Sequence, residues 1–136
     1  MDKVVFFIQK SFGKVCLYKD KEGLLLEFIP IVDGEEKDSS DPNYCLIKIE
    51  KAYLGEFLVV CRCFLSGFET PDFTYAKNLS SEEEIIVRLY RDKQKNVDEC
   101  WLRLVTGKTE DKRKRIKLTK RDLVCLQTAL ETILFD

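Results

Sequence analysis

The chain has 136 residues, of which 45% are hydrophobic and 35% are charged, and its formal net charge is −1. This length suits a single domain, and the apolar content supports a packed core and excludes global disorder. A near-neutral charge excludes nucleic-acid binding through bulk charge, so any such binding would depend on local patches. No apolar run is long enough to cross a bilayer, and we expect no membrane partner.

The sequence lacks residues and motifs on which common catalytic mechanisms depend. Histidine is absent, which removes the commonest general base and a common zinc ligand. No phosphate-binding glycine motif and no nucleophile-elbow motif is present. We therefore predict that the protein is not an enzyme, with no catalytic residues, no metal site and no cofactor.

Six cysteines indicate the compartment. All of them lie inside apolar segments, and the apolar N-terminal stretch VVFFI is too short for a signal peptide. We expect reduced, buried thiols in an intracellular protein of the nucleus or cytoplasm that is not secreted. The cysteines are Cys16, Cys45, Cys61, Cys63, Cys100 and Cys125.

In the first half, apolar periodicity predicts strands and then a helix. Residues 4–8 form an apolar leading strand, and Val15 and Leu17 alternate with polar neighbours as in a second strand. A third strand ends at the turn-forming pair Asp33-Gly34, and a short fourth strand covers residues 45–49. The period then changes, and a helical stripe contains Leu54, Phe57, Leu58, Cys61 and Leu65.

The second half repeats this order after a connector over residues 66–81, which we expect to include a leading strand. Alternation predicts strands at residues 85–90 and 100–105, and a short strand follows at residues 115–118. Thr119 and Asp122 form an N-terminal helix signature. The helical stripe contains Leu123, Leu126, Leu130, Ile133 and Leu134.

Three segments of the first half resemble three of the second half, in the same order. The segment CLYKDKEG matches RLYRDKQK, FIPIVDGEEKD matches WLRLVTGKTED, and LIKIEKAYLGEFLVVCRCFL matches RIKLTKRDLVCLQTALETIL. This alignment pairs Phe28 with Trp101, and Leu54 with Leu123. We predict a single α+β domain over residues 1–136, made of two ββββα units at about 1–68 and 69–136.

These units resemble a known superfamily. The second half, from IIVRLYRDKQKNVDECWLRLV to IKLTKRDLVCLQTALETI, is similar to the positive-cofactor transcriptional coactivators, and the first half, with KVCLYKDKEGLLLEFIPIV, is similar to a PUR repeat; Whirly proteins belong to the same superfamily. The resemblance implies curved antiparallel sheets with two packed helices, here as an intramolecular pseudo-dimer.

The resemblance also implies a function. Members of this superfamily bind single-stranded nucleic acid on their sheets, so we expect a non-enzymatic single-stranded DNA- or RNA-binding protein, such as a transcription or replication factor, that is a monomer or a homodimer. The first half departs from the pattern through its acidic residues, which weakens the case for binding there. These are Asp33, Glu35, Glu36, Asp38 and Asp41.

Candidate binding residues combine cations with flat aromatic rings, which single-stranded nucleic acid requires. Strand alternation predicts that one face of the second unit carries Arg88 and Tyr90, with Trp101 and Arg103 beside them. The competing interpretation is that Trp101 belongs to the core and the arginines cover its edge. Weaker candidates in the first unit are Tyr18, Lys14, Phe28 and Lys19.

The stretch KRKRIKLTKR is the one dense basic segment. It could contact phosphates, act as a nuclear-localisation signal, or be an ordinary solvated hairpin. Its candidate phosphate contacts are Arg113, Lys114, Arg115 and Lys117.

Two other functions remain open. The duplicated fold could serve as a protein-interaction module, in which a partner protein is held by four anchor residues: Phe64, Phe68, Phe73 and Tyr75. Alternatively, the strands could form a seven-stranded barrel capped by the last helix, as in pleckstrin-homology-like domains.

Overall fold

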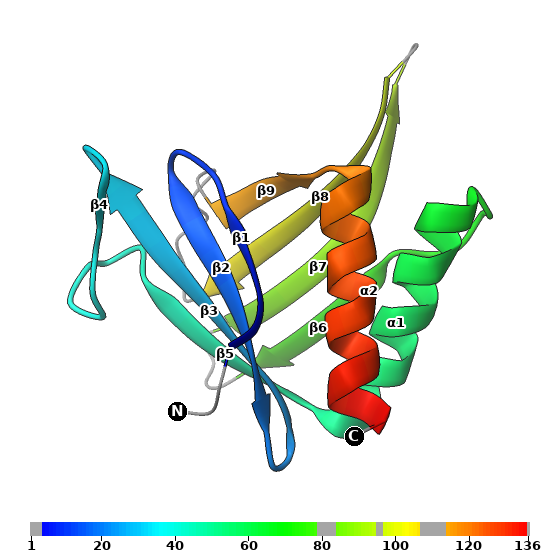
Figure 1. Cartoon of the computed structure of the whole chain (residues 1–136), viewed down its shortest axis with the longest axis horizontal. Helices are drawn as coiled ribbons and strands as arrows, with labels where there is room; N and C mark the ends of the chain where they lie inside the picture. Colours follow the sequence, from blue (N-terminus) through cyan, green and yellow to red (C-terminus); the bar gives the residue numbers. More distant parts are fainter. Residues whose placement is uncertain (1–3, 79–83, 95–96, 107–113, 136) are drawn as a thin grey trace.

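The computed structural model describes residues 4–78, 84–94, 97–106 and 114–135. Two antiparallel sheets, each followed by a helix, make up this part of the chain (Figure 1). The elements are β1 (Val4–Gln9), β2 (Gly13–Asp20), β3 (Gly23–Val32), β4 (Glu35–Glu36), β5 (Cys45–Glu50), α1 (Lys51–Ser66), β6 (Phe73–Asn78), β7 (Glu84–Gln94), β8 (Val97–Thr106), β9 (Arg115–Leu118) and α2 (Lys120–Phe135).

The first sheet has the order β1-β2-β3-β5, and the two-residue strand β4 also pairs with β3. Its inner face is apolar, as the alternation predicts, because alternate residues of β2 and β3 are apolar and buried; these are Val15, Leu17, Leu24, Leu26 and Phe28. The second sheet has the equivalent order β6-β7-β8-β9. The predicted α+β fold of two ββββα units is therefore confirmed.

The strand registers align the two units residue by residue. Three buried positions run across each sheet: Leu17, Leu26 and Ile47 in the first, and Leu89, Leu102 and Ile116 in the second. The equivalence extends to the helices, because Leu54 and Leu123 are each the fourth residue of a 16-residue helix and both are buried.

The register corrects one part of the sequence alignment. Tyr18 pairs with Leu25, and Tyr90 pairs with Trp101, so Leu25 rather than Phe28 is the counterpart of Trp101. The shift of three residues is odd, and it therefore moves the side chain to the other face of the sheet. Phe28 is fully buried on the inner face, whereas Trp101 lies half-buried on the outer face.

The helices begin in different ways. In α2, the Thr119 hydroxyl accepts a hydrogen bond from the Asp122 amide at 3.1 Å, and the Asp122 carboxylate accepts one from the Thr119 amide at 3.0 Å. This confirms the predicted cap. The N-cap position of α1 is Glu50, which makes no side-chain capping bond, and α1 ends at Gly67 in a left-handed conformation.

One hydrophobic core includes residues of both units. The two helices lie side by side (Figure 1) and pack together, while each also contacts the first strand of the other unit: α1 contacts β6, and α2 contacts β1. Phe57 of α1 stacks on Phe73 of β6 with ring centroids 4.4 Å apart. This exchange joins the units into an intramolecular pseudo-dimer.

The topology also excludes the barrel alternative. A helix, α1, separates two four-stranded meanders, so the strands do not form one barrel capped by a terminal helix. Within the described ranges, neither helix is long and apolar enough to cross a membrane.

Candidate nucleic-acid interface

The outer face of the second sheet carries the four residues that strand alternation predicted to share it. Arg88 and Tyr90 of β7 and Trp101 and Arg103 of β8 are all half-buried, while the residues between them are buried beneath the sheet. Trp101 therefore does not belong to the core. We call this surface, with Arg115 and Lys117 of β9, the basic-aromatic face.

Three arginines form a row across this face. Arg88 is the ladder partner of Arg103, and Arg103 is the ladder partner of Arg115. Like charges directly opposite one another in a sheet are destabilising. Asp72 offsets part of this repulsion, because its carboxylate accepts hydrogen bonds from Nε and Nη2 of Arg88 at 3.1 and 2.5 Å. A surface that concentrates cations in this way is suited to an anionic ligand.

A second row, next to the arginines, is aromatic. Tyr90 pairs with Trp101, and Trp101 pairs with Lys117. The guanidinium of Arg88 lies 4.6 Å from the centroid of the Tyr90 ring, and that of Arg115 lies 4.5 Å from the centroid of the Trp101 ring. These cation–π contacts hold both rings and both cations in place on the surface. Lys117 forms an ion pair with Glu99 at 2.9 Å.

The described residues of the basic segment KRKRIKLTKR differ in their exposure to solvent. Lys114 is 3% exposed, and its ammonium group donates a hydrogen bond to the Thr106 hydroxyl at 2.9 Å, so the prediction that it contacts phosphate is wrong. Arg115 and Lys117 are exposed, as that prediction requires. Arg113 lies outside the described residues.

The equivalent face of the first sheet has different chemistry. By the ladder registers, the counterparts of Arg88, Arg103 and Arg115 are Cys16, Glu27 and Leu46. The arginine row is thus replaced by a thiol, a carboxylate and an apolar side chain. This face offers no row of cations to a phosphate backbone.

Glu27 is the centre of a polar cluster on the first sheet. Its carboxylate is mostly buried and accepts hydrogen bonds from the hydroxyls of Tyr18, at 2.7 Å, and Tyr44. The bond to Glu27, together with burial, raises the pKa of Tyr18 far above its usual value. Burial and the bond to Glu27 raise the pKa of Tyr44 to about 12. The Tyr18 hydroxyl is thus committed to an internal carboxylate.

Tyr18 and Lys19, two of the weaker candidates of the first unit, do not share a face of the sheet. They are consecutive residues of β2, and alternation directs their side chains to opposite faces. The predicted protein-binding anchors are also mostly internal, because Phe64, Phe73 and Tyr75 are buried. Only Phe68 of that group is exposed, at 67%.

Sequence reasoning missed Asp72, Glu99 and Glu27, the carboxylates that shape the two faces. Asp72 is 16 residues from Arg88, and their contact depends on the pairing of β6 with β7. No local pattern marks such a pair. In the part of the chain that the structure describes, no group of three or more cysteine and carboxylate side chains could hold a metal ion.

No protein-family model matches the chain, and no curated protein matches it either.

Proposed function

We propose that this protein binds single-stranded DNA or RNA on the basic-aromatic face and catalyses no reaction. The observation that carries the proposal is the row of Arg88, Arg103 and Arg115 beside the paired rings of Tyr90 and Trp101. Cations neutralise phosphates and release their counterions, while flat rings stack on bases. Both requirements are met on one side of one sheet.

Single strands suit this face better than duplexes. Bases in a duplex are stacked on one another, and only unpaired bases can spread out on aromatic or guanidinium planes. In the free protein, Arg88 and Arg115 already lie over the two rings. An incoming base would either stack on the outer side of a guanidinium or displace it, and a displaced guanidinium could then pair with the adjacent phosphate.

The resemblance to PUR-repeat, Whirly and coactivator proteins supports this proposal, because that superfamily binds single strands on the sheets of paired ββββα units. The chain has the same unit order and paired helices. A transcription or replication factor, working in the nucleus or cytoplasm, fits this proposal. A reducing compartment would also keep six unbridged cysteines as thiols.

Titration with fluorescently labelled oligonucleotides tests the proposal. We expect single strands to bind more tightly than the matching duplex, with affinity that falls steeply as salt rises. Replacing Trp101 with Ala should weaken binding by about 1–3 kcal/mol, the contribution of one stacked base.

Lys117→Ser has a matched control in Lys48→Ser, since Lys48 occupies the same position of the first sheet and also forms carboxylate ion pairs. Only Lys117→Ser should weaken binding and flatten the salt dependence. Equal effects of both changes, or no binding of any oligonucleotide at low salt, would contradict the proposal. Far-ultraviolet circular dichroism confirms that each variant is folded.

A further inference from the structure

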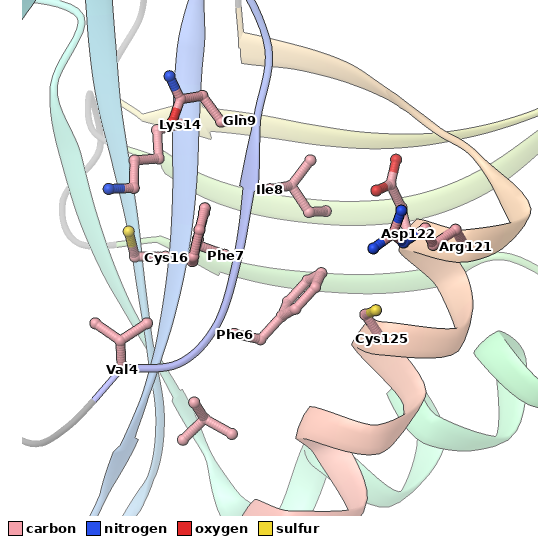
Figure 2. A pocket seen from close by; sticks show the side chains of 11 residues that line it. Val4, Phe6, Phe7, Ile8, Gln9, Lys14, Cys16, Arg121, Asp122 and Cys125 are labelled. Carbon is pink, nitrogen blue, oxygen red and sulfur yellow. The ribbon is translucent and has the colours of Figure 1, made fainter.

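A hollow of about 740 Å³ lies between the edge strand β1 and the helix α2. Figure 2 shows Phe6 and Ile8 pointing from β1 toward α2, where Arg121 and Cys125 face them, whereas Phe7 lies on the other side of the strand. This hollow is separate from the basic-aromatic face, which belongs to the other sheet.

The other unit shows what fills the equivalent space. There, Tyr53 of α1 meets Tyr75 of β6 edge to face at 5.2 Å, and Phe57 stacks on Phe73. The register makes Ile8 the counterpart of Tyr75, and helix position makes Asp122 the counterpart of Tyr53. Two aromatic rings at one helix–strand contact are thus replaced by two smaller side chains at the other. The hollow lies where this contact lacks those rings, and Ile8 and Asp122 line it.

The strand beside the hollow has a free backbone edge. Among the described strands β1 pairs with β2 alone, so its other edge is not used in a ladder. Its sequence, VVFFIQ, contains no charged residue and no proline, the residues that commonly protect an edge strand from pairing. Phe7 is 54% exposed. Such an edge can accept an added strand.

The rim of the hollow is positively charged. Asp122 is already neutralised by the Lys10 ammonium group at 3.1 Å and also caps α2. No ion pair joins Arg121 to any other residue that the structure describes, and its side chain is exposed. Lys14 lies 5.0 Å from the Phe7 ring centroid and is paired with Glu36 at 3.5 Å, so Arg121 supplies the uncompensated positive charge among these groups. A carboxylate on the occupant would complement this rim.

We propose that this site binds an extended acidic peptide segment of a partner protein, which adds to β1 as a further strand and inserts one aromatic side chain beside Phe6 and Cys125. The free backbone edge favours a peptide over nucleic acid, because a peptide can continue the ladder of amide and carbonyl groups. The charge favours an acidic partner over a second copy, since pairing of two β1 strands would bring two cationic rims together.

A peptide series tests the site with the full chain. Fluorescein-labelled peptides of about ten residues would alternate Val and Thr, with Trp, Tyr, Leu or Ala at the centre and Glu, Thr or Lys beside it. Fluorescence polarisation should show the tightest binding for Trp or Tyr with Glu, at least about tenfold tighter than for Ala with Lys. The bound peptide should also protect Cys125, a lining residue, from alkylation.

Two variants at the hollow, each with a neighbouring control variant, distinguish peptide binding at this site from general effects of a substitution on the protein. Cys125→Phe fills the hollow and should abolish binding, while the neighbouring Val124→Phe, at a position 47% exposed, should not. Arg121→Glu should weaken binding of the Glu peptides several-fold, and Lys120→Glu should leave it unchanged.

Three results would overturn the proposal. The first is failure of all peptides to bind folded protein, and the second is binding that ignores Cys125→Phe and Arg121→Glu. The third is that the peptides leave Cys125 unprotected, while a single-stranded oligonucleotide or the formation of a dimer detected by light scattering protects it. None of these results depends on the basic-aromatic face, so the two proposals are tested independently.

Discussion

At the scale of single residues, the basic segment shows how adjacent cations can serve different purposes. Lys114 immediately precedes β9 and is buried against Thr106, whereas Arg115 begins the strand, lies exposed and covers the Trp101 ring. A buried ammonium group needs a hydrogen-bond partner, and Lys114 has one. Its charge is therefore internal to the fold, and only Arg115 of the two belongs to the basic-aromatic face.

Replacing each of these residues with Met should separate their roles. Lys114→Met should change affinity for single strands less than about twofold, because its charge is shielded from a ligand on the outer face. Arg115→Met should weaken binding and reduce the slope of log affinity against log salt by about 0.7, the contribution of one phosphate contact on a single strand. Salt titrations of both folded variants provide the measurement. The same slope for both variants would remove Arg115 from the interface.

At the scale of elements, the two helices have equal length but unequal local support. The helix α2 has reciprocal capping bonds between Thr119 and Asp122. The helix α1 lacks a side-chain cap and contains Gly55, yet it is as long. The contacts of α1 with the core, through residues such as Phe57 and Leu54, therefore stabilise a segment of weak intrinsic helix propensity.

Gly55 offers a direct test of this imbalance. A methyl group added there would meet no atom within 4 Å, so Gly55→Ala should raise the free energy of unfolding by about 0.5–1 kcal/mol through helix propensity alone. Gly67→Ala is the matched control, because φ at Gly67 is 76° and the change should destabilise by about 1 kcal/mol. Chemical denaturation measures both. Destabilisation by Gly55→Ala would mean that α1 is not a regular helix at that position.

At the scale of the whole molecule, the two units share one core but present different outer faces. Each helix packs beside the first strand of the other unit, which makes the units depend on each other for stability. The arginine row is found on the second sheet, and on the first sheet the central arginine position is taken by the buried carboxylate of Glu27, which accepts hydrogen bonds from Tyr18 and Tyr44. We infer that two units are needed for folding and that the second unit carries the proposed nucleic-acid interface.

Phe57→Ala tests this dependence between units. Phe57 belongs to the first unit and is fully buried against Phe73 of the second, so its removal should cost about 3–5 kcal/mol. The fluorescence of Trp101, the single tryptophan, reports on the second unit. Its denaturation midpoint should fall together with that of far-ultraviolet circular dichroism. Val59→Ala, at an exposed position of α1, should shift neither, and separate midpoints in Phe57→Ala would show that the units unfold independently.

The sequence by itself determined the elements, their order and the faces of the second sheet. Periods of two and 3.6 residues are local properties, so the strands, the helix α2 with its cap, and the common face of Arg88, Tyr90, Trp101 and Arg103 could all be predicted. The repeat also predicted that the units are equivalent.

Only the tertiary structure decided which residues meet across strands and helices. The alignment of Phe28 with Trp101 failed by three residues, because ladder register depends on pairing that short-range similarity does not encode. The burial of Lys114, the cluster around Glu27 and the hollow beside β1 also depend on contacts that short-range similarity does not encode. The contact of Lys114 with Thr106 and the cluster around Glu27 each form within one unit, where strand pairing brings the side chains together. The hollow beside β1 forms only when the two units pack, because α2 of the second unit lies against β1 of the first.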